Sequence, residues 1–225
     1  MNRFQINLRS RNNLNKTASI WTLSLYLMTA LLFYTGSVNA SEEALYGPKA
    51  PPGSAFVRVF NNAQSALLTA NVGGKTMTAE GAYGASAYEF LPAGEYTLSI
   101  KNIDHTLTLA ADHYYTAYLD ASGKISTVEG RAFNQRKKSL IAFYNLTEAP
   151  LTLKTENGKG TVIKDVASKT SGFREVNAVK IGLAAFNETE KVVSASPIAL
   201  KRGEIFSLFA TSNPSAHPTL VWIQE

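Results

Sequence analysis

The stretch AFVRVFN, residues 55–61, recurs as SLIAFYN, residues 139–145, and this echo decides how the chain is organised. The offset of 84 residues aligns Asn61 with Asn145 at the end of these stretches, and beyond them Leu67 with Leu151, Gly74 with Gly158, and Lys75 with Lys159. Further along, residues 107–119 align with residues 198–210 at an offset of 91. The change of offset predicts about one longer loop in the second copy.

Each copy is long enough to form a small domain, and two copies are too few for a solenoid, which needs about three stacked repeats. Short alternating strands follow one another, with turn residues about every 8 to 12 positions, as is typical of sandwiches and barrels. We therefore expect an all-β fold of two tandem small antiparallel β-sandwich (Ig-like) domains. No amphipathic helix of useful length competes with this interpretation.

Turn residues give the expected hairpins and strands. Gly73-Gly74 and Asn157-Gly158 are hairpin signals, and Pro92-Ala93-Gly94 indicates a tight turn. We expect further strands at residues 95–100, 106–109, 114–119, 178–186 and 220–223, with Trp222 as a core anchor of the last one.

Residues 1–40 have the pattern of a secretory signal peptide. Four basic residues precede an uncharged stretch at 17–40, and Val38-Asn39-Ala40 offers a small-x-small cleavage site. The alternative is an uncleaved membrane anchor, but the apolar centre at 20–34 is shorter than the ~20 residues that a spanning helix needs. We expect an exported protein that begins at Ser41.

Charge is unevenly divided over the rest of the chain. Residues 41–225 hold 18 basic and 17 acidic residues, so the high pI is largely an effect of the signal peptide and gives no reason to expect nucleic acid as a partner. Residues 41–130 have a net charge of −4 and residues 131–225 a net charge of +5. Opposite charge could help the two domains to dock, or both could simply be solvated surfaces.

Two connecting segments complete the organisation. Residues 41–53 form a proline-rich arm, on which Leu45 and Tyr46 either pack back on the first domain or form a docking peptide. Residues 54–127 and 139–225 are the expected domains, and residues 128–138 the expected linker. The linker carries Arg136, Lys137 and Lys138, which could contact a polyanion or a partner, although a charged, solvated linker is the more common explanation.

No motif predicts catalysis, a cofactor or a metal site. The chain has no cysteine, no GxSxG and no pattern typical of zinc, calcium, P-loop or dinucleotide sites. His105 and His113 each follow an aspartate directly, and adjacent residues on a strand point to opposite faces, so neither forms a productive pair. The third histidine, His217, stands apart. The pattern favours a binding or scaffolding protein over an enzyme.

Five segments, at residues 44–61, 90–100, 150–160, 173–186 and 200–209, together resemble the AlgF family of periplasmic alginate O-acetylation proteins. The resemblance covers nearly all of the chain after the signal peptide, in the family's order. It implies a periplasmic protein required for acetylation of alginate, a polyuronate exopolysaccharide. It also implies that the acyl-transfer chemistry belongs to partners, namely a membrane-bound O-acyltransferase and periplasmic acetyltransferases.

Two hypotheses from different classes follow. An adaptor would link these partners through protein surfaces such as the Leu45/Tyr46 arm, a sheet edge or the charged domain faces. A polyuronate-binding module would instead need exposed aromatic rings, for which Tyr83 and Tyr88 are candidates, together with Lys or Arg to pair with carboxylates. Because the first domain is acidic, a sugar site would fit the basic second domain better. A weaker third possibility is an acetyl carrier using an unrecognised serine or histidine.

Overall fold

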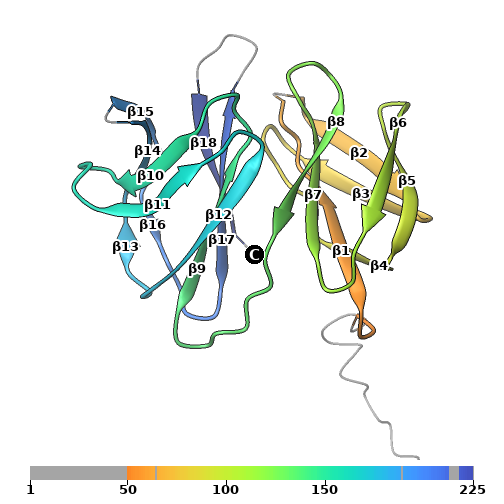
Figure 1. Cartoon of the computed structure of the whole chain (residues 1–225), viewed down its shortest axis with the longest axis horizontal. Coiled ribbons are helices and arrows are strands. Elements are labelled where there is room, and N and C mark those ends of the chain that lie inside the picture. The colour runs from red at the N-terminus through yellow and green to blue at the C-terminus, as the bar shows by residue number, and fades with distance from the viewer. Residues whose placement is uncertain (1–49, 64, 189, 213–217, 225) are drawn as a thin grey trace, which may run out of the picture. The chain divides into compact units, whose positions relative to one another are not determined.

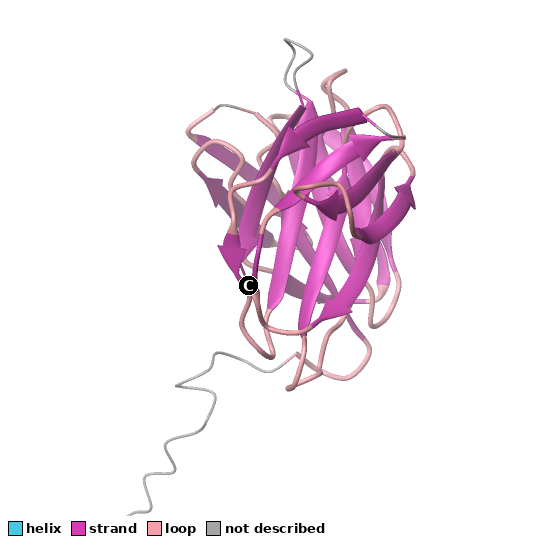
Figure 2. Ribbon diagram, turned by 90° about the vertical axis from the view of Figure 1, so that its left-hand side faces the viewer, coloured by secondary structure: helices cyan, strands magenta, loops and turns pink. Residues whose placement is uncertain are grey.

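A computed structural model describes residues 50–63, 65–188, 190–212 and 218–224 of the chain. These residues form strands and loops, with no helix among them (Figure 2). It follows that no helix in this part of the chain is long and apolar enough to cross a membrane. The expected signal peptide and the arm residues Leu45 and Tyr46 lie outside the described residues.

The first half of the chain forms two four-stranded sheets, in the orders β4-β1-β7-β8 and β3-β2-β5-β6 (Figure 1). Their strands are β1 (Ser54–Val59), β2 (Leu67–Val72), β3 (Lys75–Glu80), β4 (Glu89–Pro92), β5 (Gly94–Ile100), β6 (Ile103–Leu109), β7 (Tyr114–Leu119) and β8 (Ile125–Gly130). Residues from both sheets contribute to one buried apolar core. We call this half the first sandwich.

The second half repeats the plan with sheets β12-β9-β17-β18 and β11-β10-β14-β15, and adds a short pair, β13-β16. Its strands are β9 (Ser139–Asn145), β10 (Leu151–Thr155), β11 (Thr161–Val166), β12 (Thr170–Val176), β13 (Lys180–Ile181), β14 (Leu183–Asn187), β15 (Glu190–Ser194), β16 (Ile198–Ala199), β17 (Ile205–Ser212) and β18 (Pro218–Gln224). This second sandwich has its own core. The structure thus confirms the all-β fold of two tandem sandwiches.

Strand register confirms the internal repeat. In the first sandwich Phe56 lies beside Tyr114, and in the second Leu140 lies beside Ile205. Leu140 follows Phe56 by 84 residues and Ile205 follows Tyr114 by 91, the two offsets found in the sequence. Both strand pairs are parallel, which is an exception to the antiparallel pairing that we expected. In each sandwich the chain crosses to the other sheet between the two strands, so the second strand runs in the same direction as the first.

The longer loop predicted for the second copy is the β14–β15 hairpin. In the first sandwich Ile100 pairs with Ile103 across a two-residue turn, whereas Ala184 pairs with Ser194 at the equivalent place. The second hairpin is therefore longer by seven residues, the difference between the two offsets.

Several expected boundaries change. Strand β8 runs to Gly130, so the first three residues of the expected linker belong to the first sandwich; Val128 is only 3% exposed because it packs in a buried cluster. The strand expected at 178–186 is two strands, β13 and β14, separated at Gly182. Strand β6 begins at Ile103, earlier than expected, and the sequence patterns did not predict β4 or β12.

The repeated stretches are largely apolar because their strands are buried on both faces. On β1, Val57 and Val59 face the first core, and Phe60, one residue past its end, joins a separate cluster. On β9, all seven residues are buried; Phe143 faces the second core and Tyr144 faces that same separate cluster. Doubly buried strands lose the apolar–polar alternation of half-exposed ones. The strands that reveal the repeat therefore also join its two copies.

Candidate functional site

The separate cluster is a seam that joins the two sandwiches. It is built by buried residues of both halves: Phe60, Tyr118, Val128, Ala142, Tyr144, Leu146 and Phe209. The ring of Phe209 stacks between Phe60, at a centroid distance of 4.1 Å, and Tyr144, at 4.5 Å. Aromatic stacks of this kind add to the free energy that apolar burial provides.

Arg58 lies inside this seam and is only 1% exposed. Its Nε donates a hydrogen bond of 3.0 Å to Thr116 Oγ1, and its Nη2 donates one of 3.3 Å to Ser207 Oγ. The guanidinium carbon lies 4.5 Å from the ring centroid of Tyr88 and 5.5 Å from that of Phe209. Thr116 and Ser207 are equivalent in the repeat, so one arginine bridges the same position of both sandwiches.

Polar contacts surround the seam. Arg131 Nη2 lies 2.8 Å from Glu175 Oε1, and Lys169 Nζ lies 3.7 Å from Asp120 Oδ2. Ser171 Oγ donates to the Glu129 carbonyl oxygen at 2.6 Å. The Lys169–Asp120 pair joins opposite charges of the two sandwiches, and the Arg131–Glu175 pair joins the linker to β12. Such pairs near the surface stabilise weakly. The buried aromatic cluster therefore dominates the stability of this contact.

Beyond the seam, the same sheet face of the first sandwich carries half-exposed aromatic residues. Phe90, Phe56 and Tyr114 are neighbours across β4, β1 and β7, and Tyr88 lies beside Arg58. We call these four residues the aromatic row. Phe56 stacks on Tyr114 at 4.4 Å with an interplanar angle of 8°, and Tyr88 meets Tyr114 edge to face.

The ring geometry limits what the aromatic row can bind. Because Phe56 and Tyr114 stack on each other, the ring faces between them are already covered. Sugar rings stack on exposed aromatic faces, whereas protein partners pack against apolar edges as readily as faces. Tyr88, a candidate stacking ring, has Arg58 over it. The row is therefore better suited to a protein partner.

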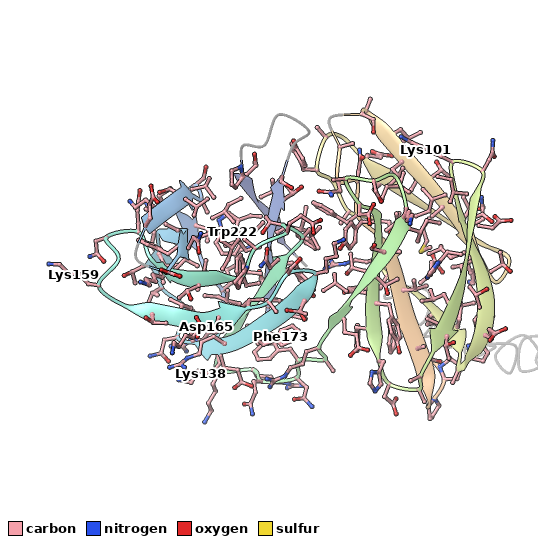
Figure 3. The ribbon with its side chains drawn as sticks, turned by 45° about the horizontal axis from the view of Figure 1, so that its top comes forward. Lys101, Lys138, Lys159, Asp165, Phe173 and Trp222 are labelled. Atoms are coloured by element: carbon pink, nitrogen blue, oxygen red, sulfur yellow. The ribbon has the colours of Figure 1, made fainter. Side chains whose placement is uncertain are left out.

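Basic residues gather at one end of the second sandwich. The structure places Arg136, Lys137 and Lys138, the cluster singled out in the sequence, just before β9, and brings Lys201 and Arg202 next to them. We call these five residues the basic end; Lys138 is labelled in Figure 3.

Strand direction explains this gathering. β9 and β17 are parallel and start at the same edge of their sheet, and the Gly203 amide donates to the Lys138 carbonyl oxygen at 2.7 Å. Lys138 Nζ donates a hydrogen bond of 2.7 Å to Asn177 Oδ1, and Lys201 Nζ lies 3.7 Å from Glu204 Oε1. In the described part of the chain no carboxylate pairs with Arg136, Lys137 or Arg202. Lys201 and Arg202 lie more than 60 residues further along the chain than Lys138, so only the fold brings them next to the basic cluster.

The described histidines do not form a catalytic arrangement. His105 is exposed, and His113 Nδ1 lies 3.8 Å from Glu129 Oε2 on the surface. Neither accepts or donates a hydrogen bond with a serine or threonine hydroxyl of the described residues, and His217 lies outside them. Across the residues that the structure covers, no three His, Asp or Glu side chains gather as a metal site would require.

A cleft of about 410 Å³ opens where loops of the first sandwich meet the end of β17. The residues that line it include Asn62, Leu68, Tyr83, Lys101, Leu119 and Ser212. Asp120 is also in its wall. Burial opposes ionisation of this carboxyl, but hydrogen bonds from the Ser122 hydroxyl and the Lys124 and Ser122 amides outweigh it and lower the pKa of Asp120 to about 2.

Comparisons with known proteins point to one family. The family model described as "Alginate O-acetyl transferase AlgF" matches residues 29–207. The alginate biosynthesis protein AlgF of Pseudomonas syringae pv. tomato is 39% identical over 221 residues, covering 96% of this chain and 97% of that protein. The Pseudomonas aeruginosa protein of the same name is 40% identical over 189 residues, covering 84% of this chain and 87% of its own.

A solved structure of the C-terminal domain of AlgF from P. aeruginosa is 39% identical and covers 40% of this chain and 99% of that domain, with a TM-score of 0.37. The family match spans most of the chain, and the two relatives are similar over most of their own length. The chain therefore belongs to the AlgF family of alginate biosynthesis proteins.

Proposed function

We propose that this protein is a non-catalytic periplasmic adaptor required for O-acetylation of alginate, linking a membrane-bound O-acyltransferase to periplasmic acetyltransferases. Membership of a family that is labelled by alginate O-acetyl transfer supports the pathway. The absence of a recognisable nucleophile motif in the sequence supports placing the chemistry in the partners.

The observation that carries the adaptor role is the buried seam. An adaptor must hold two recognition surfaces at a constant separation, and Arg58 with the Phe60–Phe209–Tyr144 stack joins the sandwiches through fully buried side chains. A flexible linker would leave each sandwich free to move alone. The seam therefore supports a rigid two-domain scaffold.

The aromatic row is the surface we assign to a protein partner. Aromatic residues are enriched among the residues that dominate binding energy, and here four of them are half-exposed on one sheet face. The arm residues Leu45 and Tyr46 remain a second candidate contact from the sequence.

Calorimetric titration of residues 41–225 against the periplasmic acetyltransferases tests the proposal. We expect micromolar or tighter binding, weakened at least tenfold by Phe56→Ala together with Phe90→Ala, since loss of a hot-spot side chain costs about 2 kcal/mol or more. Leu67→Ala removes an apolar side chain that is 53% exposed on the other sheet and should leave binding unchanged. A native protein that binds no acetyltransferase would contradict the adaptor role.

A second candidate function is binding of alginate itself, and the basic end favours it. Arg136, Lys137 and Arg202 offer exposed cations that no described carboxylate pairs with, and a polyuronate presents a carboxylate on every sugar. Binding through this end should weaken as salt rises. Saturable, salt-sensitive alginate binding that is lost in the double variant Lys137→Gln, Arg202→Gln, without any protein partner, would replace the adaptor with a polyuronate-binding module.

A further inference from the structure

The cleft at the end of the first sandwich has the properties of a small-ligand site. Its volume of about 410 Å³ lies within the range of about 300–1,000 Å³ that is usual for such sites. Leu68 and Leu119 give it an apolar part, and Ser212 extends its wall into the second sandwich. Because both halves contribute residues, the complete cleft exists only when the sandwiches are joined.

Three polar groups of the cleft are available to a ligand. The Lys101 ammonium and the hydroxyls of Tyr83 and Ser212 have neither a hydrogen bond nor an ion pair within the described chain. Asn62 adds a side-chain amide whose Nδ2 donates to the Leu119 carbonyl oxygen at 3.3 Å. Lys101 is labelled near the upper edge of the first sandwich in Figure 3.

The backbone holds two of these residues in conformations that L-amino acids rarely adopt. Tyr83 has a φ of 57° and Lys101 a φ of 49°, and Asn102, next to Lys101, has a φ of 63°. Lys101-Asn102 forms the two-residue turn between β5 and β6, where asparagine and glycine are the favoured residues. Non-glycine residues with positive φ cluster at ligand sites more often than elsewhere.

The negative charge beside Lys101 does not neutralise the site. The Asp120 carboxylate accepts hydrogen bonds from Ser122 and Lys124 in its own turn and from Ser126 at the start of β8. Lys169 Nζ lies 3.7 Å from Asp120 Oδ2. Its charge is therefore compensated inside the protein. Lys101 remains the unpaired cation of the cleft.

We propose that this cleft binds a single carboxylated sugar residue, with the Lys101 ammonium on the carboxylate, the Tyr83 and Ser212 hydroxyls on ring hydroxyls, and Leu68 and Leu119 under the apolar ring face. One cation, several neutral hydroxyl partners and a small apolar wall match a uronate better than a phosphate, which would require more positive charge. The proposal goes beyond the adaptor role and uses different residues from the aromatic row and the basic end.

An NMR titration of residues 41–225 tests this site, with glucuronate, short alginate oligomers and neutral glucose oligomers of equal length as probes. We expect saturable shifts of the Asn62, Lys101 and Gly123 amides with the two uronate probes and none with the neutral one. Lys101→Gln should raise the dissociation constant at least tenfold, as loss of a charged hydrogen bond predicts. Lys124→Gln, at an exposed lysine of the neighbouring β7–β8 turn, should not change it.

The possible outcomes separate the proposals. Weaker binding in Lys101→Gln, with normal binding in the Lys137→Gln, Arg202→Gln variant, supports the cleft. Loss of alginate binding only in the latter variant overturns it and assigns the polymer to the basic end. An equal response to neutral oligomers, or no saturable binding, also overturns it, while the acetyltransferase titration still decides the adaptor role independently.

Discussion

Asn61 and Asn145 end the two repeated stretches, and in each sandwich the side-chain amide donates hydrogen bonds to backbone carbonyl oxygens. Asn61 Nδ2 donates to the carbonyl oxygens of Ser65 and Gly81 at 2.7 and 2.8 Å. Asn145 Nδ2 donates to those of Ala149 and Val166 at 2.8 and 3.0 Å. Both asparagines are fully buried, and each amide finds its hydrogen-bond partners among backbone carbonyl oxygens.

Replacing either asparagine by alanine should therefore be costly. Asn61→Ala or Asn145→Ala removes a fully buried amide and its hydrogen bonds to the backbone, and we expect each to lower the free energy of unfolding by about 1–3 kcal/mol. Urea denaturation followed by circular dichroism measures the change. Asn71→Ala, which removes an exposed amide that accepts from Thr76 Oγ1, is the control and should cost under about 0.5 kcal/mol. Equal effects at all three positions would contradict the burial argument.

Tyr118 predicts a response to alkaline pH. Burial first, and then the negative charges of Asp120 and Glu148, raise the pKa of its hydroxyl from about 10 to about 12. Because the unfolded chain ionises at the lower pH, this stabilisation is complete below pH 10 and is lost as pH rises towards 12.

Tyr118→Phe should flatten this alkaline loss of stability, measured by urea denaturation between pH 8 and pH 12. At pH 7 the variant should be no less stable, because the replaced hydroxyl is buried without a hydrogen-bond partner of ordinary geometry in the described structure. A marked loss of stability at pH 7, or an unchanged alkaline slope, would show that the hydroxyl makes a contact of a different kind.

Among the elements, edge strand β12 shows how glycine permits close packing. A Cβ on Gly172 would lie 2.5 Å from Ile163 Cγ2 and 2.9 Å from Val166 Cγ2, both on β11. The absence of a side chain therefore lets β12 and β11, from different sheets, close one side of the second sandwich.

Gly172→Ala should lower the free energy of unfolding by about 1–3 kcal/mol, because a methyl group overpacks a filled core. Gly182→Ala is the matched control, since the atom closest to its new Cβ is Glu156 Oε2, at the end of a flexible side chain that can rotate away. Chemical denaturation of both variants makes the comparison. If Gly182→Ala lowers the free energy of unfolding as much as Gly172→Ala does, the cost comes from replacing a glycine and not from the contact between β12 and β11.

For the whole molecule, the seam predicts that both sandwiches unfold together. Residues 41–225 contain one tryptophan, Trp222, which packs on the second core, and one methionine, Met77, in the first core. Trp222 fluorescence and the Met77 methyl NMR signal thus report the two halves separately. In the native protein both unfolding curves should coincide.

Phe209→Ala should separate those curves and cost about 3–5 kcal/mol, because it removes the central ring of the seam stack. Leu183→Ala creates a cavity in the second core and should destabilise by about 2–5 kcal/mol. It leaves the seam intact, so its two curves should stay closer than those of Phe209→Ala. Coincident curves in Phe209→Ala would show that another contact couples the sandwiches.

The repeat, the all-β class and the family can be read from the sequence, because strand periodicity, turn residues and identical positions are local signals. The sequence also contains Arg136, Lys137 and Lys138 as one basic segment.

The fold was needed to show that β1 and β9 are buried on both faces, that Arg58 lies inside the seam and that Lys201 and Arg202 join the basic end. Each of these depends on which faces and edges meet, and residues far apart in the chain meet there. A strand's own residues set its spacing and amphipathic pattern; the partner that covers its second face is set by packing.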